Sequence, residues 1–262
     1  MGFGAAMDGT MKRYIQIIWV MLCVFNLPGE VRAGLKIYYI RHAEAGHNVA
    51  KDWKDVPKEQ WPAYVGNPKM FTPKGETQVV GVAGKLKEYH FDFIAVSPIW
   101  RARNTVLPYL KGIGAKGEIW PELQECPPPD LVLGSTELPP PSSDILNSGP
   151  PIQLPDDEAP YFTIREDGKN FYKVAPHEPQ TSADIQFVMQ NIMDRVSRGF
   201  GGTGKSILLV GHGDNGKALL MMLTKNPALR DVQISNTGLW MVEQQGDGTF
   251  KMLLLNDAPF NK

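Results

Sequence analysis

Residues 35–44 read Leu-Lys-Ile-Tyr-Tyr-Ile-Arg-His-Ala-Glu, and they decide how the rest of the chain is interpreted. Apart from Lys36, the first six residues are bulky and apolar or aromatic, which predicts a buried strand over Leu35–Ile40. That strand ends at Arg41 and His42, and ligands of open α/β sheets bind at the carboxyl ends of strands. An arginine beside a histidine there favours an anion pocket that contains a nucleophile. For an isolated pair, a polar strand end at the surface is the ordinary explanation, so the other motifs are needed.

Residues 1–33 have the composition of a secretory signal peptide. Lys12 and Arg13 form a short basic region, residues 14–27 are largely apolar, and Ala33 supplies the small residue expected before a cleavage site. We expect cleavage after Ala33 and a secreted or periplasmic mature protein without stable membrane association. The alternative is a protein anchored in the membrane through an uncleaved signal.

The mature chain is expected to begin at Gly34, and either Met1 or Met11 can be the true start. Removal of residues 1–33 leaves Cys126 as the single cysteine, because the chain has two cysteines and the other is Cys23. An internal disulfide is therefore not expected.

The composition is that of a soluble globular protein. The chain has 262 residues, is 42% hydrophobic and 21% charged, and carries a formal net charge of −1. Its length suits one large α/β domain, predicted over residues 34–262. Without a basic stripe, a nucleic-acid partner is not expected. A small anionic substrate remains possible, because it needs only a local basic pocket.

Strand and helix patterns alternate along this domain and predict a three-layer α/β/α sandwich around a mostly parallel sheet. Helix signals begin with the N-cap and proline pair Thr72-Pro73. The predicted strands are Leu35–Ile40, Phe91–Ser97, Gly117–Trp120, Ser206–Gly211 and a hairpin of Thr237–Glu243 with Thr249–Leu255. The predicted helices follow Pro73, cover Ile99–Leu110, run from Ser182 through Val196, and cover Gly216–Leu223.

Two segments interrupt this alternation. Residues 51–71 are polar and aromatic, and residues 127–160 contain repeated prolines, which block helix formation. Long irregular segments in compact domains are often binding loops. We expect both to fold over the active site.

Four further groups accompany the opening motif at predicted strand ends. Arg101 lies in Ser97-Pro98-Ile99-Trp100-Arg101, where a strand turns into a helix, and helix N-termini bind phosphate. His212 lies in Gly211-His212-Gly213 after an apolar strand. Glu125 closes the triplet Leu123-Gln124-Glu125, and Asn48 lies in the loop that leaves the first strand. These polar groups should gather at one edge of the sheet.

The ordered motifs Arg-His-x-Glu, Ser-Pro-x-x-Arg-Ala-x-x-Thr, Leu-x-Glu and Gly-His-Gly resemble those of the histidine phosphatase (phosphoglycerate mutase-like) superfamily, branch 1. The resemblance covers nearly all of the mature chain. Ala43 departs from the glycine that is more common there. The resemblance implies that His42 is a nucleophile that forms a phosphohistidine. It implies that Arg41, Arg101 and His212 bind the substrate phosphate, with Asn48 as an additional donor.

The same resemblance implies one carboxyl group that protonates the leaving oxygen and later activates water. Glu125 matches the Leu-x-Glu position best, and Glu122 and Asp214 are its competitors. Asp214 lies two residues after His212, whereas the acid phosphatase branch places its acid directly after that histidine. The spacing therefore favours Glu125.

Two other kinds of site are not expected: a phosphate-binding P-loop and a metal site. Gly199-Phe200-Gly201-Gly202-Thr203-Gly204-Lys205-Ser206 has the letters of a phosphate-binding P-loop, but it follows a helix and leads into a strand, the reverse of the required context. A metal site is not expected, because His42 and His212 lack local metal-ligand spacing and the two arginines would repel a cation.

The sequence thus predicts an exported, metal-independent phosphatase that hydrolyses small-molecule phosphomonoesters without a cofactor. A phosphoglycerate mutase that returns the phosphoryl group to its substrate is the first alternative. A catalytically inactive protein that binds a phosphate ligand is the second. The sequence indicates neither the substrate nor the oligomeric state.

Overall fold

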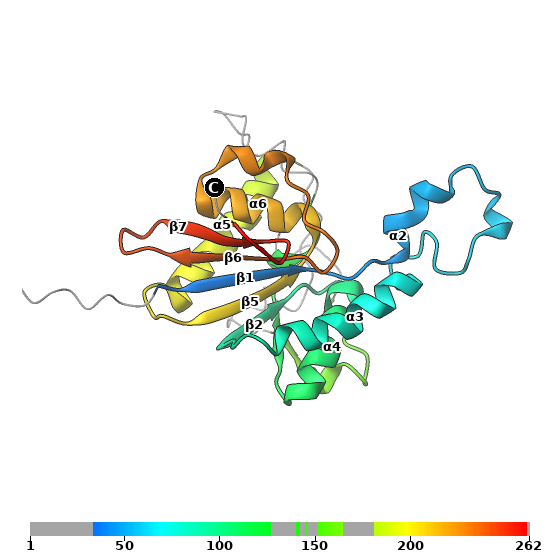
Figure 1. Ribbon diagram of the computed structural model, residues 1–262, viewed down its shortest axis with the longest axis horizontal. Helices are drawn as coiled ribbons and strands as arrows, with labels where there is room; N and C mark the ends of the chain where they lie inside the picture. Colours follow the sequence, from blue (N-terminus) through cyan, green and yellow to red (C-terminus); the bar gives the residue numbers. More distant parts are fainter. Residues whose placement is uncertain (1–33, 127–139, 142–144, 146–150, 165–180, 261–262) are drawn as a thin grey trace, which may run out of the picture. The chain divides into compact units, whose positions relative to one another are not determined.

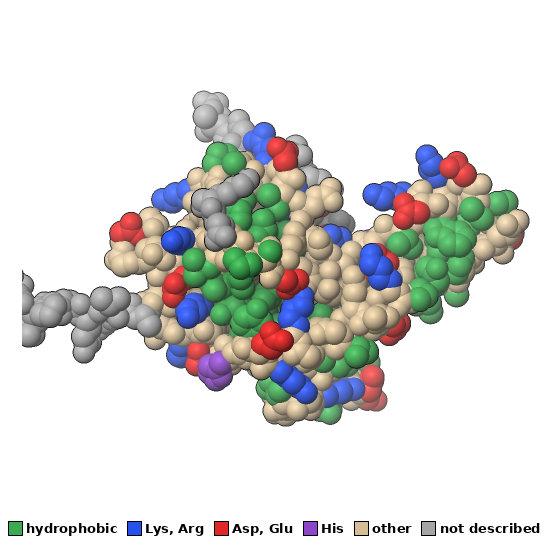
Figure 2. All heavy atoms as spheres, viewed as in Figure 1, with side chains coloured by type: hydrophobic (Ala, Val, Ile, Leu, Met, Phe, Trp, Pro, Cys, Tyr) green, Lys and Arg blue, Asp and Glu red, His purple; other side chains and the backbone are tan. Residues whose placement is uncertain are grey.

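The computed structural model describes residues 34–126, 140–141, 145, 151–164 and 181–260, all within the compact unit Ala33–Lys262. The expected signal segment, most of the proline-rich segment and the chain end lie outside these residues. Within them, no helix is long and apolar enough to cross a membrane. Lys or Arg side chains and Asp or Glu side chains are interspersed on the face that Figure 2 shows.

A single sheet of eight strands organises the described residues, in the order β4-β3-β2-β5-β1-β6-β7-β8. The strands from β4 to β1 pair in parallel, and β6, β7 and β8 are added antiparallel at the β1 side. The mostly parallel sheet predicted from the sequence is confirmed. The strands are β1 (Lys36–Arg41), β2 (Phe93–Val96), β3 (Gly117–Ile119), β4 (Phe162–Ile164), β5 (Ser206–Gly211), β6 (Leu239–Gln244), β7 (Phe250–Leu255) and β8 (Ala258–Pro259).

Helices cover both faces of the sheet and complete the three-layer sandwich (Figure 1). One layer contains α3 (Pro73–Leu86) and α4 (Trp100–Ile113), and the other contains α5 (Ser182–Phe200) and α6 (Gly213–Thr224). The short helix α2 (Gly46–Val49) lies in the loop after β1. Short 3₁₀ turns occupy 50–53, 58–60, 121–123, 159–161 and 227–231.

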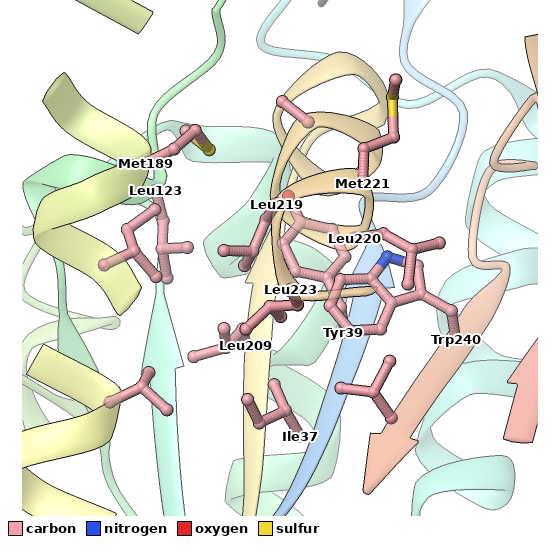
Figure 3. Packing of buried hydrophobic residues seen from close by; sticks show 14 of the residues in the cluster. Ile37, Tyr39, Leu123, Met189, Leu209, Leu219, Leu220, Met221, Leu223 and Trp240 are labelled. Carbon is pink, nitrogen blue, oxygen red and sulfur yellow. The ribbon is translucent and has the colours of Figure 1, made fainter. Parts of the chain in front are cut away.

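The alternation of side chains along β1 builds a core on each face of the sheet. Ile37 and Tyr39 face the layer of α5 and α6, and Tyr38 and Ile40 belong to the cluster under α3 and α4. Figure 3 shows the first cluster, in which Tyr39 packs flat against Trp240, with ring centroids 5.1 Å apart. Burial on both faces fixes the register of β1, and with it the place where Arg41 and His42 leave the sheet.

The structure differs from the sequence prediction in three elements. The short strands β4 and β8 were not predicted, because two or three residues carry little periodic signal. Helix α6 begins at Gly213, three residues earlier than predicted, so His212 is its N-cap residue.

The P-loop-like segment lies between the end of α5 at Phe200 and the start of β5 at Ser206, as the helix-to-strand interpretation requires.

An ion pair with almost no exposure fixes the described part of the proline-rich region to α4. Glu158 accepts from Arg103 Nε at 2.5 Å and from Asn104 Nδ2 at 2.9 Å. The two charged side chains are 3% and 7% exposed. The Pro155 carbonyl accepts from the backbone N–H groups of Glu158 and Ala159, which joins this clamp to residues 151–155.

We expect Glu158→Ala to lower the free energy of unfolding by about 3–5 kcal/mol, because the Arg103 charge would remain buried without its partner. Chemical denaturation of the purified protein measures this change. The control is Glu243→Ala, which removes an exposed pair with Lys36 at 3.8 Å and should cost less than about 1 kcal/mol. Equal losses in the two variants would contradict the account of the clamp.

Candidate active site

The carboxyl ends of three adjacent parallel strands form the candidate site. Because the sheet order is β2-β5-β1, the residues that follow these strands meet at one edge. They are Ser97 after β2, His212 after β5 and His42 after β1, and all three side chains are buried. The ring centroids of His42 and His212 lie 5.2 Å apart. The expected gathering of polar groups at strand ends is what the structure shows.

His42 is held with Nε2 as its unprotonated ring nitrogen. Its Nδ1 lies 2.7 Å from the Ala43 carbonyl, which can only accept, so Nδ1 carries the proton and Nε2 is the acceptor. Arg101 Nε donates to that Nε2 at 3.2 Å. Burial and the neighbouring Arg101 charge hold the pKa of His42 well below its usual value. The neutral ring is therefore the form present at neutral pH, and neutral imidazole is nucleophilic.

Backbone contacts fix the position of His42. Thr105 Oγ1 accepts from the Ala43 N–H at 2.8 Å and donates to the Arg101 carbonyl at 2.6 Å, so it joins the loop after β1 to the first turn of α4. Asn236 Nδ2 donates to the His42 carbonyl at 3.0 Å. A side chain fixed in this way loses little freedom when it reacts.

His212 is oriented so that one ring nitrogen remains free to donate. Ser97 Oγ accepts from the Ile99 N–H at 3.2 Å and lies 2.9 Å from His212 Nε2. Among the described residues, His212 Nε2 is the acceptor in reach of the hydroxyl proton, so we assign the hydroxyl as donor to it. With Nε2 as the acceptor, the proton of neutral His212 is on Nδ1. Burial and the charges around it hold the pKa of His212 well below its usual value, which keeps the ring neutral.

Tyr39 holds the backbone of His212 from beneath. Its hydroxyl accepts from the His212 N–H at 2.7 Å and lies 2.9 Å from both the His212 carbonyl and Asn215 Oδ1. Glycine is required at 211 and 216, because an added Cβ would lie 2.2 Å from the Tyr39 hydroxyl or 2.4 Å from its ring. Asn215 Nδ2 donates to the Gln124 carbonyl at 3.1 Å, so the same network holds the turn before Glu125.

Glu125 lies beside the predicted nucleophile. Its carboxylate accepts from Arg101 Nη2, and its side chain is 42% exposed. A carboxylate oxygen of Glu125 lies within 4.8 Å of ring nitrogens of both His42 and His47. Glu125 thus has access both to the site and to solvent, as proton transfer to a leaving oxygen and from water requires.

The two competing carboxylates occupy different surroundings. Glu122 is fully buried and pairs with Arg195 of α5. Asp214 lies in the first turn of α6, is 41% exposed, and approaches Lys217 at 3.9 Å. Its charge also acts on Arg41. The geometry therefore favours Glu125 over Glu122. The ion pair of Asp214 is with Lys217, whereas Glu125 contacts the same guanidinium that contacts His42 Nε2.

Asn48 supports a neighbouring histidine that carried no predicted role. Its Oδ1 accepts from the Ala45 N–H at 3.0 Å, which fixes the amide so that Nδ2 donates to His47 Nε2 at 3.1 Å. The proton of neutral His47 is then on Nδ1. The His47 ring lies 5.6 Å from the His42 ring, and burial and the two nearby arginines lower the pKa of His47 to about 4. In the sequence, the one indication of a role for His47 is that it directly precedes Asn48, the predicted donor to the phosphate.

Three buried nitrogens around His42 have no hydrogen-bond partner among the described residues: Arg41 Nε, His47 Nδ1 and His212 Nδ1. A different nitrogen of Arg41, Nη1, is paired: it donates to the Ile234 carbonyl at 2.7 Å. The tautomers derived above make both histidine nitrogens donors. Buried donors are normally paired, and each unpaired one requires an explanation. An anion bound beside His42 would supply acceptors for donors of this kind.

The ligand atoms of His42, His47 and Glu125 lie within 4.8 Å of one another, the spacing of a possible cation site. Arg101 already donates to two of the three, and its charge lowers the pKa of His42 and His47. A positive potential that disfavours a proton on these rings also disfavours a metal cation. The cluster fits an anion better.

The two buried histidines make stability depend on pH. In the unfolded chain both titrate near pH 6.5, and in the folded chain their pKa values lie well below that. Between these values the unfolded state binds more protons, so the free energy of unfolding falls as pH drops below about 6.5. We expect a loss of roughly 1.4 kcal/mol per pH unit from each of His42 and His212 until its folded pKa is reached.

Denaturant titrations between about pH 8 and pH 5 measure this slope. His212→Gln should flatten it by one histidine's share, and His90→Gln, whose side chain is 85% exposed in the native protein, should leave it unchanged. Stability that stays constant across the range would contradict the burial of neutral rings.

A family comparison agrees with the motifs. Residues 37–131 match the family model described as "Histidine phosphatase superfamily (branch 1)". No curated protein matches the chain. The resemblance expected from the sequence is confirmed by the family match.

Solved structures share the fold. The alpha-ribazole phosphatase from Shigella flexneri aligns with a TM-score of 0.52 and 19% identity, covering 87% of this chain and 99% of that one. A mycobacterial glucosyl-3-phosphoglycerate phosphatase in complex with VO3 aligns with a TM-score of 0.52 and 16% identity, covering 85% of this chain and 99% of that one. At these identities the similarity establishes the phosphoglycerate mutase-like fold alone.

Proposed function

We propose that the chain is a phosphatase of branch 1 of the histidine phosphatase superfamily, whose family model matches residues 37–131, and that it hydrolyses phosphomonoesters through a phosphohistidine on His42. The observation that carries the proposal is the set of three unpaired buried donors, Arg41 Nε, His47 Nδ1 and His212 Nδ1, around a histidine whose Nε2 is an acceptor. Such a site binds a tetrahedral anion against a nucleophile. No step of the proposed reaction requires a metal or cofactor.

In the first step, His42 Nε2 attacks phosphorus in line with the bond to the leaving oxygen. A phosphate oxygen replaces Nε2 as the acceptor for Arg101 Nε. The N–P bond forms, the P–O bond breaks, and Glu125, which enters this step protonated, gives its proton to the leaving oxygen. Arg41 and His212 donate to the oxygens that gain charge, which lowers the barrier because these donors are already in place.

In the second step, water attacks the phosphohistidine. Glu125, now a carboxylate, takes a proton from the water, the new P–O bond forms, and the N–P bond breaks. Inorganic phosphate leaves, and His42 returns to its neutral state. Glu125 is ionised and protonated once in each cycle, so one carboxyl group serves both steps.

The experiment that tests this function measures phosphate release from sugar, nucleotide, inositol, alkyl and aryl phosphates with protein lacking residues 1–33. We expect inorganic phosphate to be the product. Isomerised substrate without phosphate release would favour a phosphoglycerate mutase. Tight binding of a phosphate ligand without turnover would favour an inactive binding protein.

We also propose that the protein is exported, on the basis of the signal-like composition of residues 1–33. Expression of the full chain, cell fractionation and N-terminal sequencing test this directly. A periplasmic or secreted protein that begins at Gly34 supports the proposal. An intact N-terminus on protein retained with the membranes would instead support an uncleaved anchor.

A further inference from the structure

A cavity of about 690 Å³ lies beside the reacting groups. Its walls include Trp100 and Arg101 from the start of α4, Gln124 from the turn before Glu125, and Ile152, Leu154 and Pro155 from the proline-rich region. We call this the pocket beside Arg101. A volume of this size is typical of small-molecule sites.

The pocket borders the atoms that hold the nucleophile and the acid. Arg101 forms part of its wall, and the same guanidinium contacts His42 Nε2 at 3.2 Å and the Glu125 carboxylate. Gln124, another wall residue, directly precedes Glu125. Since Glu125 is the proposed proton donor to the leaving oxygen, the group attached to that oxygen has this pocket as its neighbour.

Apolar side chains dominate the pocket walls. Trp100, Ile152 and Leu154 face it together with several prolines. The arginines that border it are engaged, Arg101 as described and Arg103 with Glu158 and the Pro98 carbonyl. Lys69, Gln124 and Gln153 are further polar residues of the lining, against eight apolar ones. A sugar or polyol placed here would lose more hydrogen bonds to water than these groups replace, which costs binding free energy.

The pocket walls are held in place without a ligand. Ile152 and Leu154 pack against the core under α3 and α4, and Trp100 packs on Phe71 with ring centroids 4.7 Å apart. Glu158 fixes the following turn to α4. A preformed apolar wall binds an apolar group with little loss of conformational entropy.

We propose that the pocket beside Arg101 receives the alcohol part of the substrate, and that this alcohol is apolar. The substrate class is then a phosphomonoester of an alkyl or aryl alcohol, in preference to a sugar or polyol phosphate. The inference rests on the proposed phosphatase function, because it takes His42 and Glu125 as the reacting groups.

A series of n-alkyl phosphates from methyl to hexyl tests the proposal, because its members share one leaving-group chemistry and differ in apolar area. We expect kcat/KM to rise about threefold per methylene, or roughly 10²-fold over the series, and to be low for glycerol phosphate. The matching alkylphosphonates, which are not cleaved, should bind more tightly as the chain lengthens, with Kd falling by about the same factor in calorimetry.

Two variants address the walls of the pocket. Leu154→Asn and Trp100→Ala should each reduce the hexyl-to-methyl ratio of kcat/KM for the phosphates about tenfold. They should reduce the hexyl-to-methyl ratio of association constants (1/Kd) for the phosphonates by the same factor. The control is Ile113→Asn, which changes an exposed apolar residue at the far end of α4 and should leave both ratios unchanged. Using ratios removes any common effect of a variant on folding or on phosphate binding.

The outcomes separate this inference from the proposed function. A flat series, or a rising one that neither wall variant changes, would overturn the inference while hydrolysis still supports a phosphatase. A rising phosphonate series without hydrolysis of any phosphate would support the pocket and contradict the proposed function.

Discussion

Replacement of His42 by alanine is expected to lower kcat for any phosphomonoester by about 10⁴-fold or more, because the variant has no atom on which to form the phosphoryl intermediate. The fold should persist, since the His42 ring donates only to its neighbour's carbonyl and the backbone contacts from Thr105 and Asn236 do not involve it. Initial rates with an aryl phosphate measure the effect, and thermal unfolding checks the fold.

The matched control is His90→Ala. His90 is exposed and outside the site, so its loss should leave kcat unchanged. If His42→Ala retains substantial turnover while remaining folded, the nucleophilic mechanism is wrong.

The second large effect is expected for Arg101→Lys, with a loss of about 10²–10³ in kcat/KM. Arg101 contacts His42 through Nε and Glu125 through Nη2, and a lysine has a single nitrogen that cannot make both contacts. The charge is retained, so a loss of this size reports the geometry of the guanidinium rather than its sign.

Arg198→Lys is the control for that substitution, because Arg198 lies exposed in the last turn of α5. It should have no effect on kcat/KM. Equal activity of Arg101→Lys and the unaltered protein would mean that a point charge is sufficient at this position, and the two-contact role would have to be abandoned.

Much of this fold could be predicted because local patterns and tertiary packing agree. The run Leu35–Ile40 is apolar because both faces of β1 are buried, and Thr72 caps α3 by accepting from the Gly75 N–H as its sequence predicts. The motif Gly-His-Gly identifies Gly211 and Gly213 from the sequence. The physical reason for glycine at 211 and 216 is the close approach of Tyr39, and only the structure shows that Tyr39 lies beneath His212.

The parts that were missed depend on contacts distant in sequence. Glu158 is 55 residues from Arg103, and no local pattern indicates their pairing. His47 gained a role only through the amide orientation of Asn48, which the Ala45 N–H determines. The choice between Glu122 and Glu125 also needed the structure, because the two residues are close in sequence but have different partners. Glu122 is buried against Arg195, whereas Glu125 is partly exposed and contacts Arg101.

The most direct test of the central proposal is detection of the phosphohistidine itself. Glu125→Gln should slow the water step, while p-nitrophenyl phosphate, with its good leaving group, reduces the need for an acid in the first step. The Glu125→Gln variant is mixed with p-nitrophenyl phosphate, and the reaction is quenched in alkali because the N–P bond is acid-labile. Mass spectrometry should then find one phosphoryl group on His42. The double variant that also carries His42→Ala should have none. Phosphate release with no phosphoryl group on the protein, or with one on a residue other than His42, would contradict the mechanism.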